Sequence, residues 1–87
     1  MRSFVIIGLS RFGQSVAKTL YDLEQEVLVI DENESLIQNI SEHITYAIVG
    51  NVTDENVLKK AGIRNFDAAV VSTGKNLESS ILATQML

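Results

Sequence analysis

Short runs of apolar, largely β-branched residues recur four times along the chain, without the strict polar alternation of a half-exposed strand. Near-continuous apolar runs of this length are typical of parallel strands that are buried on both faces of a sheet. The runs occupy residues 4–7, 27–30, 46–49 and 68–71. We therefore predict four buried strands at these positions.

The segments between the runs have helical periodicity. In the first of them, apolar residues spaced by four, four and three positions predict one buried stripe on a helix. These residues are Phe12, Val16, Leu20 and Leu23. The helix is expected to follow Gly13 directly.

Two shorter helices are predicted further along. Apolar positions within residues 36–40 mark the second helix, for which either Asp31 or Asn33 can serve as the N-cap. The third spans about residues 54–61, because Gly62 stands where a C′ glycine commonly ends a helix.

A last helix is predicted from Leu77 to Leu87. Its apolar residues surround much of its circumference, so one stripe covers the sheet and the remainder needs a second cover. We expect this helix to pack on a second copy of the chain or on a segment that completes the domain.

Strands and helices alternate along the whole chain, which favours an open parallel sheet with helices on both faces. Right-handed crossovers then predict the strand order 3-2-1-4 of a Rossmann-like three-layer α/β unit. With 87 residues the chain is short for a doubly wound domain. We expect residues 1–87 to form a single nucleotide-binding domain that is truncated relative to a full one.

Composition narrows the function further. The net charge is −4 and the basic residues are scattered, which argues against a nucleic-acid partner. There are no cysteines, so disulfides and thiolate metal sites are excluded. No apolar run approaches the roughly 20 residues of a membrane span, so we expect a cytoplasmic chain.

The first strand leads into a glycine turn that fits the G-x-G-x-x-G frame of dinucleotide-binding folds, with serine in the middle position. Gly8 permits the tight exit from the strand, and Gly13 lets the helix pack close to the sheet. Ser10 adds a Cβ and a hydroxyl where the backbone approaches a phosphate. Arg11 is expected to pair with phosphate rather than being only solvated. Phe12, also a candidate, fits a core position better than a ligand contact.

An acidic pair follows the second strand. Asp31 lies 18 residues beyond Gly13, close to the position where an acid accepts hydrogen bonds from the ribose hydroxyls. The alternative is that Asp31 only caps the next helix. Glu32 adds negative charge that disfavours a 2′-phosphate, although such residues are more often simply solvated. We therefore expect NAD-type or simple adenine nucleotides rather than NADP.

The later strand ends supply weaker candidates. Asn51 can offer its amide to the adenine edge and Val52 can cover the ring, although a turn asparagine that caps a helix is the alternative. Thr73 and Gly74 follow the fourth strand, near the predicted switch point, where ligands bind in open α/β sheets. No nucleophile–base pair and no metal-binding cluster is present, so we expect no enzymatic activity.

The chain resembles the RCK (KTN, or TrkA-N) domain of Ktr/Trk-type potassium uptake systems. The resemblance begins with the turn Val5-Ile6-Ile7-Gly8-Leu9-Ser10-Arg11-Phe12-Gly13. It continues through Val27-Leu28-Val29-Ile30-Asp31, Gly50-Asn51-Val52-Thr53, Ala61-Gly62-Ile63, Phe66-Asp67-Ala68-Ala69-Val70-Val71 and Thr73-Gly74. It covers nearly the whole chain and is more specific than the glycine turn alone.

The resemblance implies a regulatory subunit that binds NAD(H), AMP, ADP or ATP and acts on a membrane potassium-translocating subunit at the inner face of the membrane. It also implies a homo-oligomer, either a dimer or a ring. By position, Arg11 would contact phosphate, Asp31 the ribose, and Asn51 with Val52 the adenine. The chain departs from the family pattern at Ser10, which replaces the middle glycine, and at Asn51, where aspartate is common.

Two other functions remain open on the sequence. One is the cofactor-binding half of an NAD-dependent oxidoreductase, which would need an acid/base group from a substrate domain. The other is a structural α/β module whose site no longer binds a ligand. Saturable nucleotide binding is expected of the regulatory subunit and of the oxidoreductase half, but not of the structural module.

Overall fold

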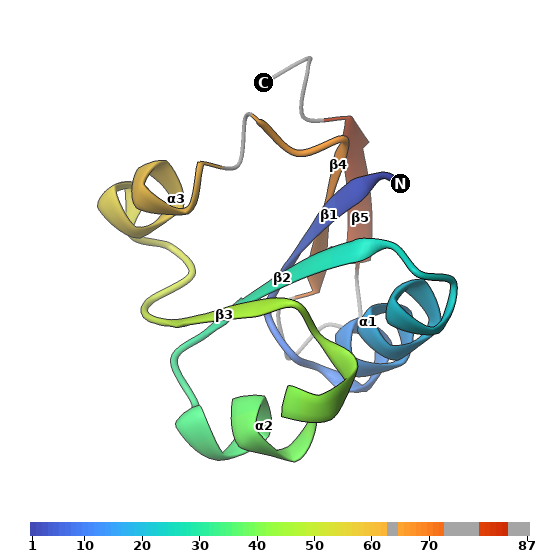
Figure 1. The fold of residues 1–87 in the computed structure, drawn as a ribbon. Helices are drawn as coiled ribbons and strands as arrows, with labels where there is room; N and C mark the ends of the chain where they lie inside the picture. Colours follow the sequence, from blue (N-terminus) through green and yellow to red (C-terminus); the bar gives the residue numbers. More distant parts are fainter. Residues whose placement is uncertain (63–64, 73–78, 84–87) are drawn as a thin grey trace.

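The computed structural model describes residues 1–62, 65–72 and, for the backbone, 79–83. Within these residues, five strands form one sheet, and the elements that connect them include three α-helices and a short 3-10 helix (Figure 1). In chain order these elements are β1 (Ser3–Ile7), α1 (Arg11–Asp22), β2 (Glu26–Asp31), α2 (Glu34–Asn39), η1 (Ser41–His43), β3 (Tyr46–Val49), α3 (Glu55–Ala61), β4 (Ala68–Ser72) and β5 (Ser79–Ala83).

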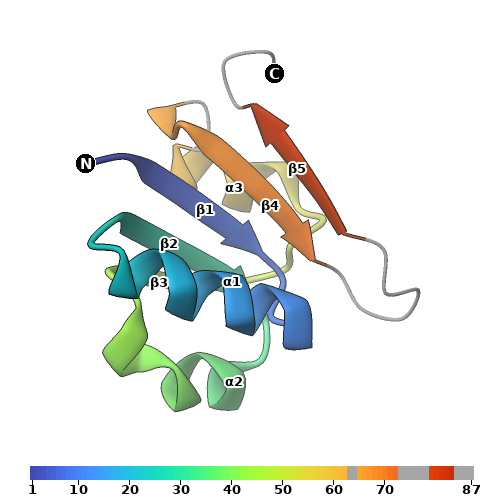
Figure 2. The same cartoon turned by 90° about the vertical axis from the view of Figure 1, so that its right-hand side faces the viewer.

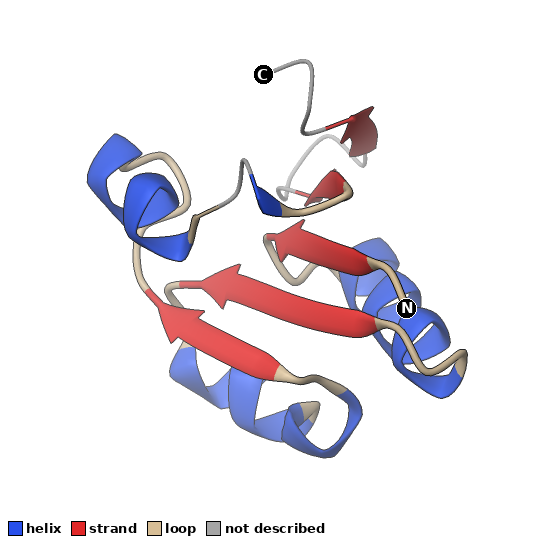
Figure 3. Ribbon diagram, turned by 45° about the horizontal axis from the view of Figure 1, so that its top comes forward, coloured by secondary structure: helices blue, strands red, loops and turns tan. Residues whose placement is uncertain are grey.

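The sheet order is β3-β2-β1-β4-β5. The first four strands are all parallel, so the predicted order 3-2-1-4 is confirmed. β1 is the central strand: Phe4 pairs with Val27 of β2 on one side and with Ala68 of β4 on the other. Helices cover both faces of the sheet, with α1 and α2 on one side and α3 on the other (Figures 1 and 3).

Side chains alternate between the two faces along each strand, and they form two separate hydrophobic clusters. Under α1 and α2, the buried members are Ile6, Leu9, Ala17, Val27, Val29, Ile37, Ile40, Ile44 and Val70. On the α3 side they are Val5, Ile7, Leu28, Ile30 and Ala69. The central strands therefore contribute to both clusters, which explains why their sequences are apolar without a break.

The short helices begin and end as the sequence predicts. The side chain of Asn33 caps α2 by accepting hydrogen bonds from the N–H groups of Ser35 and Leu36. The carboxylate of Asp54 caps α3 by accepting from the N–H of Asn56 at 2.8 Å. Gly62 ends α3 in the left-handed conformation, with φ of 68°.

The predicted stripe on α1 is only partly correct. The residues of this helix that are buried are Gly13 and Ala17, whereas Phe12 is 46% exposed and Leu23, just after the helix, is 62% exposed. Gly13 and Ala17, four positions apart, form the buried side of the helix, and Phe12 lies about 100° around the helix from Gly13, away from that side. The expectation that Phe12 is a core residue is therefore wrong.

The predicted last helix is also wrong where the structure describes it. Residues Ser79–Ala83 form β5, which pairs antiparallel with β4 and places Ile81 opposite Val70 (Figure 2). Without β5, the backbone groups along this edge of β4 would lack strand partners, and pairing overrides a weak local helix preference. The other residues of the predicted helix lie outside the described part, and the proposed oligomer contact through that helix loses its basis.

Candidate functional site

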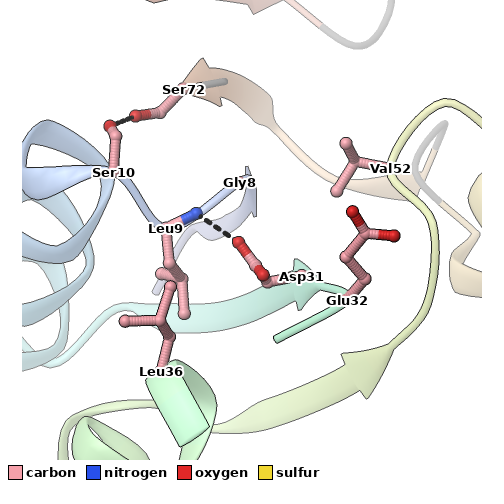
Figure 4. A pocket seen from close by; sticks show the side chains of 8 residues that line it. All are labelled: Gly8, Leu9, Ser10, Asp31, Glu32, Leu36, Val52 and Ser72. Atoms are coloured by element: carbon pink, nitrogen blue, oxygen red, sulfur yellow. Dashed lines mark hydrogen bonds between the residues drawn. The ribbon is translucent and has the colours of Figure 1, made fainter. Parts of the chain in front are cut away.

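The carboxyl ends of β1, β2 and β4 border a pocket of about 270 Å³ (Figure 4). Its lining comes from the turn after β1, the end of β2, the start of α2, the loop after β3 and the end of β4. The lining residues are Gly8, Leu9, Ser10, Asp31, Glu32, Leu36, Val52 and Ser72. Ligands of open α/β sheets bind at this edge, and the structure thus brings five predicted site residues together there: Gly8, Ser10, Asp31, Glu32 and Val52.

Gly8 makes the turn out of β1. Its φ is 97°, a conformation that side-chain-bearing residues rarely adopt. Its N–H donates to the carbonyl of Ile30 at 2.9 Å, which extends the β1–β2 pairing one residue past the strand. The chain can then turn sharply toward α1 while its backbone lines the pocket.

Gly13 brings α1 close to this turn. A Cβ at this position would lie 2.4 Å from the carbonyl oxygen of Gly8 and 3.0 Å from the Oγ of Ser72. Neither backbone nor a buried neighbour can yield that space cheaply. The glycine is therefore required for helix packing, as the sequence predicts. Gly13 itself is not one of the described residues that line the pocket.

Both oxygens of the Asp31 carboxylate accept hydrogen bonds from backbone N–H groups. Oδ2 accepts from the N–H of Leu9 at 2.8 Å, in the turn after β1 (Figure 4). Oδ1 accepts from the N–H of Asn33 at 2.7 Å, just before α2. The side chain thus ties two loops together, a structural role that the sequence did not predict. Each carboxylate oxygen has a second lone pair, so a ligand hydroxyl can still donate to it.

Ser10 is the N-cap of α1. Its backbone is extended, with φ of −65° and ψ of 175°, so this middle position of the turn needs no glycine for its conformation. Its Oγ accepts from the N–H of Gly13 at 3.4 Å and also forms a hydrogen bond with the Oγ of Ser72 (Figure 4). Ser72, at the end of β4, was not among the predicted site residues.

Ser72 is 1% exposed and is the one buried polar side chain among the residues whose burial the structure describes. The sequence carried a signal for it, because a serine ends an otherwise apolar strand. The contact itself joins residues 62 positions apart, and a separation of that size lies beyond any local pattern.

The remaining predicted residues either do not line this pocket or lie outside the described part. Arg11 is exposed as the first residue of α1, and Phe12 borders a different hollow on the outer side of the same helix. Asn51 is exposed, and its Oδ1 accepts hydrogen bonds from the N–H and the hydroxyl of Thr53. Thr73 and Gly74 lie outside the described residues.

The charges at the pocket are divided between its two sides. Asp31 and Glu32 place carboxylates on the β2 side. On the other side, α1 directs its N-terminus and the free N–H groups of its first turn to the same edge of the sheet. Such an arrangement can hold an anionic group at the helix end and hydroxyl donors at the acids.

This chain combines the glycine turn, the acidic strand end and the strand order 3-2-1-4. Its sequence matches the model of the TrkA-N domain over residues 4–87. The chain belongs to the TrkA-N domain family. This confirms the resemblance described from the sequence.

Several curated relatives are similar along nearly the entire chain. Ktr system potassium uptake proteins A and C of Bacillus subtilis (strain 168) are each 41% identical over 86 residues, which is 99% of this chain and 39% of each relative. A Trk system potassium uptake protein TrkA homolog of Pyrococcus horikoshii is 38% identical over 80 residues, 91% of this chain and 35% of that protein. The TrkA-N chain thus spans about two fifths of the length of these relatives.

The helices of the described part of the TrkA-N chain are short. No helix there is long and apolar enough to cross a bilayer.

Proposed function

We propose that this TrkA-N chain is a nucleotide-sensing regulatory module of a potassium uptake system. It binds NAD(H) or an adenine nucleotide (AMP, ADP or ATP) and passes the ligand state to a membrane potassium-translocating subunit. The names of the relatives support the potassium system. They also favour a sensor over the cofactor half of an oxidoreductase, and we propose that the chain carries out no catalysis.

The observation that carries the proposal is the pocket where the turn after β1 faces the acid that ends β2. Gly8 and Asp31 lie at the same edge, and the N-terminus of α1 points to it. A phosphate accepted by the helix end and a ribose whose hydroxyls donate to the carboxylates would both fit this division of charge. The pocket volume of about 270 Å³ lies close to the usual range of ligand sites, about 300–1,000 Å³.

Residue roles follow from position. Gly8, Ser10, Arg11 and Gly13 would form or flank the phosphate site, with Arg11 supplying the positive charge that the pocket lining lacks. The ribose would lie against Asp31 and Glu32, whose charges disfavour a 2′-phosphate. Adenine contacts would come from Asn51 and Val52, and further contacts from Thr73 and Gly74.

The module would act at the inner face of the membrane through its partner. The relatives named above are longer than this chain, so the contact with the translocating subunit need not involve the residues described here. Homo-oligomerisation, as a dimer or ring, belongs to the same proposal.

A thermal-shift panel with NAD, NADH, NADP, ATP, ADP and AMP tests the proposal. A ligand at about 100 times its Kd stabilises the folded state by about 2.7 kcal/mol, which corresponds to a rise in Tm on the order of 10 °C for a domain of this size. If no nucleotide changes the Tm at millimolar concentration, the sensor function is wrong. If NADP gives the largest shift, the roles of Asp31 and Glu32 are wrong.

A further inference from the structure

The hydroxyl of Ser72 is buried and needs a hydrogen-bond partner within the fold. Its side chain is 1% exposed, and a Cβ added at Gly13 would lie only 3.0 Å from its Oγ, which shows how closely α1 packs beside this hydroxyl. In the described part of the chain, this hydroxyl forms its hydrogen bond with the Oγ of Ser10. A buried hydroxyl that loses its partner costs free energy, so Ser72 is expected to donate its proton to Ser10.

That direction fixes what the Ser10 hydroxyl can do. A serine hydroxyl has one proton to donate and two lone pairs that accept. One lone pair of the Ser10 Oγ faces the N–H of Gly13, as the N-cap of α1, and the other receives the proton of Ser72. The proton of Ser10 is then the remaining hydrogen-bonding group, and Ser10 lines the pocket (Figure 4).

We infer that Ser72 is a positioning residue that holds the Ser10 hydroxyl as a hydrogen-bond donor toward the pocket. Ser10 thereby recognises an acceptor group, of which a nucleotide phosphate oxygen is the chemical class that fits the N-terminus of α1. The inference rests on the proposed nucleotide function and assigns a part of its specificity to a residue of β4. A donor group in the ligand would meet the Ser10 proton and be rejected.

The chain Ser72 to Ser10 to phosphate also strengthens each link. Hydrogen bonds arranged in series polarise one another, so a hydroxyl that accepts a bond donates a stronger one. Removing the Ser72 hydroxyl leaves Ser10 in place and free to rotate. The effect on binding should therefore fall on ligands that carry phosphate and should depend on Ser10.

Calorimetric titration of the chain with ADP and with adenosine tests this dependence in four variants: Ser10→Ala, Ser72→Ala, Ser72→Cys and the double variant Ser10→Ala/Ser72→Ala. Loss of the charged hydrogen bond in Ser10→Ala should weaken ADP binding about tenfold. Ser72→Ala should weaken it about threefold through the lost polarisation. Adenosine affinity should change by less than about twofold in each variant.

The double variant gives the decisive comparison. If Ser72 acts through Ser10, adding Ser72→Ala to the Ser10→Ala chain changes ADP affinity by less than about twofold. An equal effect of Ser72→Ala in both backgrounds, or an equal loss for adenosine and ADP, would overturn the inference. Ser72→Cys keeps the shape of the side chain, with a somewhat larger atom and a weaker donor, so an intermediate loss is expected even if the alanine variant folds poorly.

Failure of the inference can be told from failure of the proposed function. A wild-type chain that binds none of the nucleotides overturns both. A wild-type chain that binds ADP, with Ser10→Ala binding it equally well, overturns only the role of the serine pair.

Discussion

The carboxylate of Asp31, at the end of β2, accepts a hydrogen bond from the N–H of Leu9 in the turn after β1, at 2.8 Å. The acid that the sequence assigns to a ligand thus also holds the ligand turn in shape. Asp31 is thus assigned a role in ligand binding and a role in stability. Experiments without nucleotide measure only its role in stability.

Asp31→Asn tests the structural role. An amide offers one oxygen where the carboxylate offers two, so either the Leu9 or the Asn33 N–H loses its acceptor. We expect a loss of about 1–3 kcal/mol in the free energy of unfolding, measured by urea titration without nucleotide. Glu32→Gln removes the same charge from an exposed neighbour and should stay within about 0.5 kcal/mol of wild type. Equal losses in both variants would show that only charge matters.

Gly13→Ala tests the seating of α1. The added methyl would stand 2.4 Å from the carbonyl oxygen of Gly8, and the backbone must shift, which should cost about 3 kcal/mol of unfolding free energy. The matched control is Gly50→Ala, whose Cβ would meet only the methyl groups of Val57 at 3.1 and 3.2 Å. That side chain can yield, so its cost should stay near 1 kcal/mol. A Gly13→Ala chain as stable as the control would contradict the close packing.

Gly62 tests a conformational rather than a steric requirement. Its φ is 68°, and a Cβ there would have its nearest neighbour at 3.4 Å, which is ordinary contact. Gly62→Ala should therefore lose about 1 kcal/mol of unfolding free energy through the left-handed backbone alone. Gly62→Asn should lose less, because asparagine visits this conformation more readily. The prediction fails if alanine is the better tolerated of the two in thermal unfolding.

Arg11→Ala tests the phosphate role of the arginine. Loss of a charge-assisted contact should weaken ADP binding about tenfold while the unfolding free energy remains unchanged, because the side chain is exposed. Lys18→Ala removes a positive charge from an exposed position further along the same helix and should leave ADP affinity unaltered. Similar losses in both variants would assign the effect to overall charge rather than to a contact.

The pairing of β5 with β4 is open to a direct test by NMR. Extended backbone shifts for Ser79–Ala83, and cross-strand contacts such as that between Ile81 and Val70, are expected from the antiparallel register. Helical shifts over these five residues would restore the assignment made from the sequence.

Much of the parallel sheet could be predicted, because strands that are buried on both faces have near-continuous apolar sequences. Each end of the four predicted strands lies within one residue of its observed bound. Helix ends were equally local: Asn33, Asp54 and Gly62 act within their own turn of chain. The position of Asp31 beside Gly8 also followed, since parallel strands end at one edge.

The errors concern features that depend on contacts between residues far apart in the sequence. Periodicity identified an apolar side of α1, but the depth of contact depends on how closely the helix approaches, and Gly13 with Ala17 set that distance. Residues 79–83 read as helix because spacing alone does not reveal an open strand edge nearby. The hydroxyl pair of Ser10 and Ser72 depends on two elements brought together by the whole fold.

The central place of β1 has a consequence for how the chain is made. Residues 3–7 leave the ribosome well before their second neighbour, β4, which lies about 60 residues later in the sequence. Until β4 has been synthesised, one side of β1 has no partner strand. Pairings between strands that are far apart in the sequence form slowly. Newly synthesised chains are therefore most open to mispairing with one another during that interval. In a chain lacking residues 1–7, the pairs β2–β3 and β4–β5 would have no strand between them, and two-stranded pairs are at best marginally stable alone.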